Sequence, residues 1–193
     1  MTTLILASSS PYRRQLLEKL GLPFQAVSPE VDETRQANET PSELVERLAR
    51  LKARTVATSH PNALIIGSDQ VAVYAGDVLG KPHTESAARS QLAQLSGHIV
   101  TFLTGLCVLN STSGAEQAEV VVTPVEFREL TETEVYHYVA REQPLDCAGA
   151  FKSESLGIAL FASIGGSDPN ALVGLPLISL CRMLRTEGVT VLG

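Results

Sequence analysis

Residues 64–73 are the stretch that most constrains the fold. Their sequence, Leu-Ile-Ile-Gly-Ser-Asp-Gln-Val-Ala-Val, is an apolar, β-branched run interrupted by four small or polar residues. Apolar residues on both sides of the interruption predict a strand that is buried on both faces. An ionised carboxylate in such a strand needs a partner or a metal ion. We therefore expect Asp69 to lie in a cleft and to carry chemistry; the alternative is that it ends the strand and caps a turn.

The composition indicates a folded protein with a single domain over residues 1–193, since 44% of the residues are hydrophobic and 19% are charged. No apolar run approaches the roughly 18 residues of a membrane-spanning helix. Residues 1–7 contain neither a basic segment nor a long apolar one, so we expect no signal peptide. The three cysteines are too widely spaced for a metal-binding pair or a disulfide framework, which favours buried free thiols and a cytoplasmic location.

The formal net charge of −6 argues against binding to a nucleic acid polymer or to a membrane surface. It does not exclude a small anionic ligand, because a local cluster of basic residues can bind phosphate within an acidic protein. A small molecule is therefore the kind of partner that the charge leaves open.

A strand, a hydroxyl-rich turn and a helix are predicted near the start of the chain. Residues 4–7 are apolar, Ser10 suits an N-cap and Pro11 suits the first helical position. Backbone N–H groups at such a helix N-terminus attract anions. Arg13 and Arg14 occupy the first turn, where the helix dipole disfavours cations, and an anion bound there would offset this effect. The alternative is that both arginines are simply solvated.

The remaining pattern mixes helices, strands and hairpins, which predicts a mixed α/β fold. A capping box at Thr40 and Glu43 opens a helix that we expect to reach Ala57. A closing helix over about 170–186 is apolar nearly all round, and Pro176 should bend or split it. The other predicted elements are a strand at 24–27, a hairpin at 74–79, a helix from 84 to about 96, strands at 99–109 and 118–127, and a helix over 131–141.

Basic and acidic side chains recur at strand ends, turns and helix edges. Lys81 lies in a rigid Gly-Lys-Pro turn, Lys52 lies at the edge of an apolar helix face, and Lys152 follows an aromatic residue. Glu30 lies in an acidic loop of the kind that supplies oxygen ligands to Mg²⁺, and Asp69 is a second carboxylate at a similar strand end. With a divalent metal ion this set suits attack of water on a phosphoanhydride, because cations stabilise phosphate charge while a carboxylate activates or orients the water.

Five short motifs occur in order along the chain. They are Ser8-Ser9-Ser10-Pro11-Tyr12-Arg13-Arg14, Pro29-Glu30-Val31-Asp32-Glu33, Gly67-Ser68-Asp69-Gln70-Val71, Gly80-Lys81-Pro82 and Phe151-Lys152-Ser153-Glu154. Together they resemble the Maf family of nucleotide pyrophosphatases and, within it, the YceF-like branch that acts on 7-methyl-GTP. The resemblance runs from residue 4 to about residue 184.

This resemblance implies hydrolysis of a nucleoside triphosphate to the monophosphate and pyrophosphate. It implies a divalent metal cofactor (Mg²⁺ or Mn²⁺), a cytoplasmic location and a homodimer. The fold that it implies is an elongated mixed β-sheet with flanking helices and two lobes around a cleft, similar to the inosine-triphosphatase fold.

The resemblance also implies roles for individual residues. Asp69 would accept a proton, with Lys52 and Lys81 as further catalytic residues, and it would share the metal ion with Glu30. The substrate would be bound by Ser8, Arg13, Arg14 and Lys152.

Base preference would depend on Tyr12, Gln70 and Glu154. The 7-methylguanine base is positively charged, so Tyr12 could stack on it with a cation–π contribution of roughly 0.5–2 kcal/mol. Glu154 could accept hydrogen bonds from the guanine edge. The branch commonly has tryptophan at this position. The tyrosine of this chain should keep the stacking but weaken it. The alternative is that Tyr12 packs beneath the helix start and that Glu154 pairs with a lysine.

Two other functions are compatible with the sequence. One is a housecleaning pyrophosphatase for other non-canonical or pyrimidine nucleotides. The other is a nucleotide-binding regulator of cell division, for which the apolar closing helix could serve as an interface.

Overall fold

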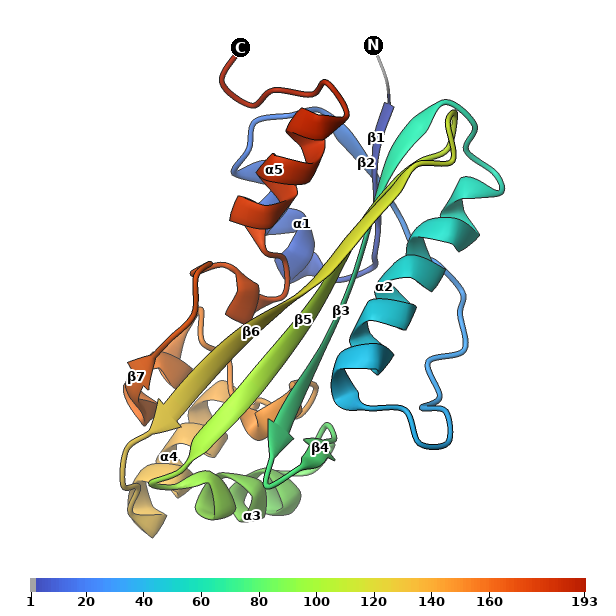
Figure 1. Cartoon of the computed structure of the whole chain (residues 1–193). Helices are drawn as coiled ribbons and strands as arrows, with labels where there is room; N and C mark the ends of the chain where they lie inside the picture. The colour runs from blue at the N-terminus through green and yellow to red at the C-terminus, as the bar shows by residue number, and fades with distance from the viewer. Residues whose placement is uncertain (1–2) are drawn as a thin grey trace. The chain divides into compact units, whose positions relative to one another are not determined.

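The computed structural model describes residues 3–193 and has a mixed α/β architecture (Figure 1). Within this range seven strands form one mixed sheet in the order β2-β1-β3-β5-β6-β7, with β4 paired to β3. This confirms the predicted fold class. The elements are β1 (Thr3–Ala7), α1 (Pro11–Glu18), β2 (Phe24–Val27), α2 (Pro41–Ala57), β3 (Ala63–Tyr74), β4 (Asp77–Leu79), α3 (Glu85–Leu95), β5 (Ile99–Asn110), β6 (Glu116–Phe127), α4 (Glu132–Glu142), β7 (Phe161–Ile164), α5 (Leu177–Thr186) and the short 3₁₀ turns η1 (Ala148–Ala150), η2 (Leu156–Leu160) and η3 (Ala171–Val173).

Contacts divide the chain into two compact units. The first unit comprises the residues up to 70 together with 103–121 and 168–193, and the second comprises 71–102 and 122–167. The long strands β3, β5 and β6 contribute residues to both units. A single domain over residues 1–193 stays a prediction. The expectation of no signal peptide concerned residues 1–7. Of these, Met1 and Thr2 lie outside the described residues.

In the first unit, β3 is buried on both faces, as its sequence predicts. It pairs in parallel with β1, and β1 pairs in parallel with β2. Leu64 and Ile66 belong to the core that includes side chains of α1 and α5, whereas Ile65 packs with residues of α2. Figure 1 shows α2 on one side of the strands and α1 and α5 on the other. Successive residues of β3 therefore face different helices.

Two glycines allow α2 to approach the sheet closely. A Cβ atom at Gly67 of β3 would overlap the carbonyl oxygen of Ala49, and one at Gly105 of β5 would overlap that of Val45. The start of α2 is fixed independently, because Thr40 and Glu43 form the predicted capping box. The helix therefore has both a defined first residue and a short distance to the sheet.

An aromatic cluster forms the core of the second unit. The ring of Phe151 lies edge-on to the rings of Phe102, Phe127 and Phe161, with centroid distances of 4.8–5.6 Å. Gly149 and Ala150 precede it with positive φ angles of 78° and 56°. This bend turns the chain just before the Phe-Lys-Ser-Glu motif.

The predicted closing helix is the main element whose bounds were wrong. Residues 171–173 form η3, and the α-helix begins only at Leu177 because Pro176 occupies its N-cap. Pro176 thus splits the helix, which was one of the two expected outcomes. The buried carboxylate of Asp168 accepts hydrogen bonds from the N–H groups of Ile178 at 2.6 Å and Asn170 at 2.9 Å. Asp168 thereby caps the N-terminus of α5, because the proline side chain at the N-cap cannot accept a hydrogen bond. Strand β7 was not predicted.

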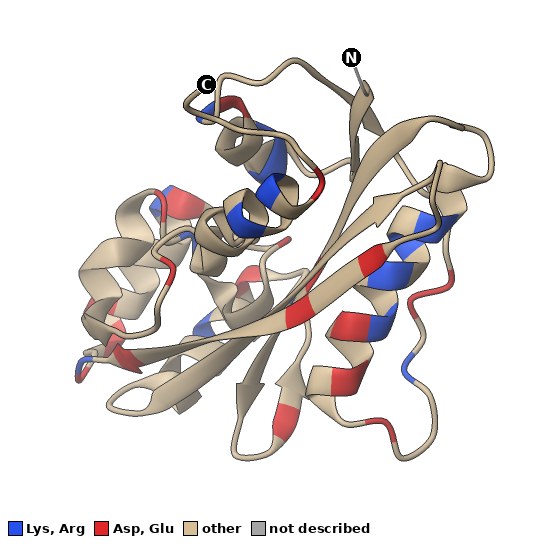
Figure 2. Cartoon of the chain, turned by 45° about the horizontal axis from the view of Figure 1, so that its top comes forward, with Lys and Arg blue, Asp and Glu red and all other residues tan. Residues whose placement is uncertain are grey.

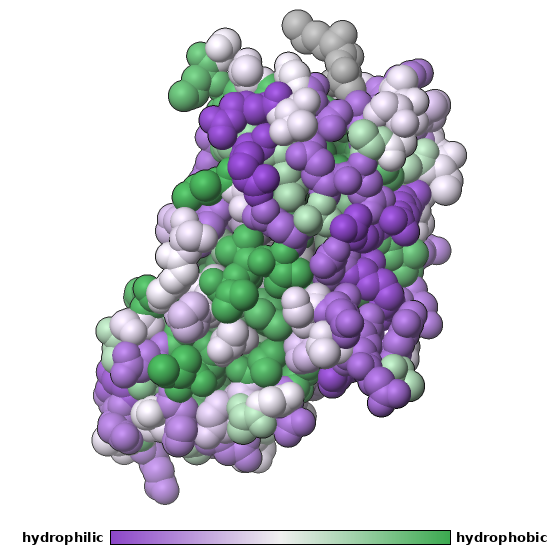
Figure 3. Space-filling model, viewed as in Figure 1, coloured by the Kyte–Doolittle hydropathy of each residue, from purple (hydrophilic) through white to green (hydrophobic). Residues whose placement is uncertain are grey.

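The face of the molecule seen in Figure 3 carries hydrophobic residues as well as hydrophilic ones. Val122 of β6 is 50% exposed and Ile178 of α5 is 58% exposed. All three cysteines are free thiols, but Cys107 alone among them is buried, so the expectation of burial fails for Cys147 and Cys181. None of the helices formed by residues 3–193 has the length and apolarity that a bilayer crossing needs.

The close approach at Gly67 gives the first prediction. Gly67→Ala forces a methyl group against a helix backbone oxygen that cannot move alone, so we expect a loss of about 2 kcal/mol or more in the free energy of unfolding. Urea denaturation measures this. Gly80→Ala is the control, because a Cβ at Gly80 meets open space. Equal stability of Gly67→Ala and the wild type would contradict the close packing of α2.

Candidate active site

The side chain of Lys52 lies between two carboxylates. Its Nζ atom is 2.7 Å from Asp69 Oδ1 and 2.7 Å from Glu33 Oε1. The side chains of Lys52 and Asp69 are 9% and 11% exposed, whereas that of Glu33 is 60% exposed. The pair is thus a buried ion pair with a second, solvent-facing carboxylate on the same ammonium group. Buried charges of this kind persist only when they are paired.

The strand and the helix explain why this pair forms. Asp69 lies inside β3, which continues to Tyr74, so it does not end the strand as the alternative reading supposed. Residues two positions apart in a strand point to the same face of the sheet. Asp69 therefore points to the face on which a Cβ atom at Gly67 would meet α2. Lys52 lies one turn of helix beyond Leu48 on the buried face of α2. The sequence placed Lys52 only at the edge of that face.

Glu33 is a residue that sequence reasoning missed. It lies in the acidic motif from which Glu30 was selected, and the structure brings Glu33 to Lys52 while Glu30 is exposed. The motif itself was the signal, but the spacing within a loop does not tell which carboxylate turns inward.

The buried carboxylate of Glu39 anchors this loop. It accepts hydrogen bonds from Arg47 and from the N–H of Gln36, and its backbone carbonyl accepts bonds from Arg35. The hydrogen bond from Arg47 is the main reason that the pKa of Glu39 falls to about 2. Arg47 also donates to the carbonyl of Thr34. The residue next to Glu33 is therefore held by α2, the helix that carries Lys52.

The predicted phosphate-binding turn forms at the start of α1. Ser10 caps the helix by accepting a hydrogen bond from the N–H of Arg13, and Ser8 accepts one from the N–H of Ser10 at 3.1 Å. Arg13 donates through Nε to the carbonyl of Gly174 at 2.8 Å. Burial lowers the pKa of Arg13, and the nearby carboxylates of Asp69 and Glu33 act in the opposite direction. Arg13 shares the carbonyl of Gly174 with Ser68, so it lies close to the residue before Asp69 in β3.

Arg14 and Tyr12 differ from Arg13 in their surroundings. The side chain of Arg14 is 64% exposed and pairs with Glu18 at 3.2 Å, one turn further along α1. Arg14 therefore matches the alternative in which the arginine is simply solvated. Tyr12 is half-buried in the first turn of the helix.

Gln70 faces the opposite side of β3 from Asp69. Its Nε2 atom donates to Thr104 Oγ1 at 2.9 Å, to the carbonyl of Ala171 at 2.8 Å and to that of Leu172 at 3.1 Å. The neighbouring Ser68, which is fully buried, donates to the carbonyl of Gly174 at 3.0 Å. One strand therefore presents an ion pair to α2 and hydrogen-bonding groups to the segment around η3.

Three predicted site residues lie in the second unit. Lys81 is exposed. Lys152 donates through Nζ to the carbonyl of Glu142 at 3.2 Å, at the end of α4 where the helix dipole favours a cation. Glu154 is exposed and accepts a hydrogen bond from Ser153 Oγ at 3.3 Å. Its polar partner is thus a hydroxyl group and, among the residues that the structure describes, not a lysine.

Carboxylate oxygens are the donors that Mg²⁺ prefers, and two carboxylates surround the ammonium group of Lys52. Asp69 and Glu33 supply carboxylate oxygens on either side of one ammonium group. Within residues 3–193, no three acidic, histidine or cysteine side chains gather as a complete metal site. Mg²⁺ is commonly held by one or two carboxylates together with water and substrate phosphates, which is compatible with such a partial set.

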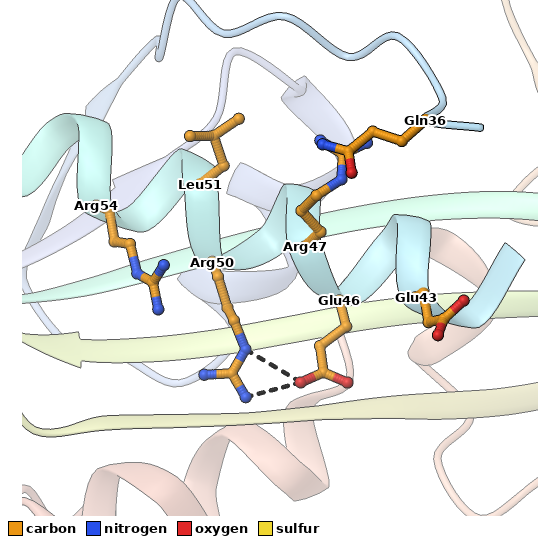
Figure 4. Close-up of a pocket in the computed structure, with 7 residues that line it drawn as sticks. All are labelled: Gln36, Glu43, Glu46, Arg47, Arg50, Leu51 and Arg54. Carbon is orange, nitrogen blue, oxygen red and sulfur yellow. Dashed lines mark hydrogen bonds and ion pairs between the residues drawn. The ribbon is translucent and has the colours of Figure 1, made fainter. Parts of the chain in front are cut away.

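Charged residues also line a cavity of about 470 Å³ beside α2 (Figure 4). Its arginines are already paired: Arg50 with Glu46 and Glu116, and Arg54 with Glu116. Figure 2 shows that α2 carries both basic and acidic residues. A second cavity, of about 610 Å³, lies between α3 and α4 and is lined by residues that include Arg89 and Tyr136. Neither cavity contains a predicted site residue.

An open α/β sheet, a buried lysine–carboxylate pair and a serine-capped helix start with an arginine in its first turn define a candidate phosphate-processing protein. The family model described as "Maf-like protein" matches residues 3–187. The chain therefore belongs to the Maf family. A curated relative, the 7-methyl-GTP pyrophosphatase of Pseudomonas putida (strain KT2440), is 57% identical over 191 residues, which cover 99% of this chain and 100% of the relative.

The buried ion pair gives the second prediction. Lys52→Met leaves the Asp69 carboxylate without its main cation and should lower the free energy of unfolding by about 3 kcal/mol. Adding Asp69→Leu removes the unpaired charge and should restore most of that loss. Urea denaturation of the single and double variants at neutral pH measures both effects.

Arg14→Met is the control for loss of a basic side chain. Arg14 forms only an exposed pair, so the change should stay within about 0.5 kcal/mol. If Asp69→Leu destabilises the Lys52→Met variant further, the pair is not the dominant interaction of these residues.

Proposed function

We propose that this protein hydrolyses 7-methyl-GTP to 7-methyl-GMP and pyrophosphate with the help of a divalent metal ion. The main support is the 57% identity to a 7-methyl-GTP pyrophosphatase over 99% of the chain. The buried Lys52–Asp69 pair, with Glu33 on the same ammonium group, supplies chemistry that suits this reaction.

The reaction requires attack of water on the α-phosphorus and cleavage of its bond to the oxygen that bridges to the β-phosphate. In our proposal Asp69 accepts the proton of the attacking water. Lys52 holds the carboxylate in place through the ion pair between them. The released pyrophosphate leaves with the bridging oxygen. A base positioned in this way contributes typically 10²–10⁴-fold to a rate.

Phosphate binding is proposed for the turn before α1 and for the basic residues of the motifs. The N–H groups at the start of α1 and the guanidinium of Arg13 suit the triphosphate. Ser8 would donate its hydroxyl, and Arg14, Lys81 and Lys152 would add positive charge. The last three are assigned by their motifs alone. In the described structure Arg14 is bonded to Glu18 and Lys152 to the end of α4, so these bonds would be exchanged for phosphate.

Mg²⁺ or Mn²⁺ is the proposed cofactor, held by Asp69 and a carboxylate of the acidic loop. Glu30 was the sequence-based choice for that second carboxylate. Glu33 is the better candidate, because it shares Lys52 with Asp69. The ion would neutralise phosphate charge and lower the pKa of a bound water.

Recognition of the base is proposed for Tyr12, Gln70 and Glu154. Tyr12 would stack on the positively charged 7-methylguanine ring. Glu154 would accept hydrogen bonds from the guanine edge, and its exposed carboxylate leaves it free for this task. The proposal extends to a cytoplasmic homodimer.

Product identification gives the third prediction. With Mg²⁺ or Mn²⁺, the wild type should release pyrophosphate and not orthophosphate from 7-methyl-GTP. Asp69→Asn keeps the shape of the side chain but removes the base, so kcat should fall at least a hundredfold. Ion chromatography of the products and steady-state kinetics measure these outcomes.

Asp77→Asn is the matched control, since Asp77 is an exposed aspartate at the start of β4 and lies outside the site. Its kcat should equal that of the wild type. Release of orthophosphate alone would contradict the proposed bond cleavage. A kcat for Asp69→Asn within a factor of ten of the wild type would contradict the role of Asp69.

Base preference gives the fourth prediction. Glu154→Gln replaces an acceptor by an amide and removes a charge opposite the cationic base, so the ratio of kcat/KM for 7-methyl-GTP over UTP should fall about tenfold. A panel of methylated, purine and pyrimidine nucleotides measures it, with the exposed Glu132→Gln as control. An unchanged ratio would favour the broader housecleaning pyrophosphatase instead.

A further inference from the structure

One ammonium group lies between the two carboxylates of the candidate site. Nζ of Lys52 is 2.7 Å from Asp69 Oδ1 and 2.7 Å from Glu33 Oε1, so these two oxygens are at most twice that distance apart. Within residues 3–193, Lys52 is the only lysine or arginine that forms an ion pair with either carboxylate. Two facing carboxylate oxygens are also what proteins offer to divalent cations. The ammonium group thus lies where a bound cation would be expected.

Both carboxylates are held in place by parts of the fold that do not involve Lys52. Asp69 lies inside β3, which continues on both sides of it. The loop that carries Glu33 is fixed to α2 by Arg47, which donates to the carbonyl of Thr34 at 3.1 Å. Removal of the ammonium group would therefore leave two carboxylates facing each other. Such a pair repels itself and gains from any cation that replaces the missing one.

The charges at the site set the ammonium group and a divalent ion against each other. The two carboxylates carry two negative charges, of which Lys52 neutralises one. A divalent ion neutralises both, so the ion and the ammonium group together leave an excess of positive charge. The side chains of Lys52 and Asp69 are 9% and 11% exposed, and little water screens such an excess there. The second oxygen of each carboxylate does not relieve it, because that oxygen shares the same single charge.

We propose that Lys52 is a built-in competitor of the divalent ion. Its ammonium group keeps Asp69 and Glu33 facing each other, and it gives way when a divalent ion binds both carboxylates. Glu33 is the exposed member of the group, at 60%, so the ion reaches the site from the solvent on that side. The flexible four-carbon stem of the lysine then lets the ammonium group reach a phosphate of the substrate. The inference rests on the proposed function in that these two carboxylates take the ion, but it does not require hydrolysis.

Binding of Mn²⁺ without nucleotide tests the competition, with electron paramagnetic resonance of the free ion as the readout. Lys52→Met should bind Mn²⁺ about tenfold more tightly than the wild type, because the competing charge is gone. Lys52→Arg keeps that charge and should show the wild-type affinity. Arg14→Met is the matched control, since Arg14 pairs with Glu18 and with neither carboxylate of the site. The gain in Lys52→Met should persist at about 1 M KCl, where the Debye length is about 3 Å and more distant charges are screened.

A second measurement covers the case in which Lys52→Met does not fold alone. Mn²⁺ should then restore its structure, because a ligand that binds only the folded state shifts the folding equilibrium. Far-UV circular dichroism during a Mn²⁺ titration measures this. The double variant with Asp69→Leu lacks one of the two carboxylates and should show no such response.

Displacement itself is observed in the ¹⁵N signals of the side-chain ammonium groups, since the chain has four lysines. In the wild type, saturating Mg²⁺ should move the Lys52 signal toward that of a solvated lysine and leave Lys19, which donates to Asn170, unchanged. An unchanged Lys52 signal overturns the inference, as does Mn²⁺ binding by Lys52→Met that is no tighter than in the wild type. If the competition is observed but 7-methyl-GTP is not hydrolysed, the proposed function alone fails.

Discussion

The buried ion pair between Lys52 and Asp69 depends on how closely α2 lies against β3. Lys52 can reach the carboxylate because Gly67 and Gly105 leave room for the backbone of the helix. The charges are stable there because each has a partner at 2.7 Å. The acidic loop joins the pair through Glu33 and is held by Glu39, whose own partner Arg47 also lies on α2. A single helix thus sets the position of the whole group.

Adjacent residues of β3 serve the two sides of the sheet. The alternation of a strand sends Asp69 toward α2 and Gln70 toward η3. Bond cleavage and base recognition, if both are performed as proposed, are therefore separated by the thickness of one strand. This separation explains how a carboxylate and an amide can be neighbours in sequence without competing for the same partners.

Local sequence signals predicted much of the fold. Residues 64–73 were recognised as a doubly buried strand, and the capping box of α2 fixed the first residue of that helix. Features that depend on distant contacts were missed. Glu33 turns inward because a loop is anchored at Glu39, and Gln70 bonds to residues about a hundred positions away. Strand β7 is four residues long and exists through pairing with β6, so its own sequence carries little signal.

The hydrogen bonds at η3 have a consequence for the order in which the chain becomes functional. Arg13, Ser68, Gln70 and Thr104 are all synthesised before residues 171–174, yet their donors are satisfied by the carbonyls of that segment. Asp168 and α5 hold the segment in place. A nascent chain that stops before residue 168 lacks the carbonyl groups that orient these side chains. These side chains are therefore oriented only after residues 168–186 have been synthesised.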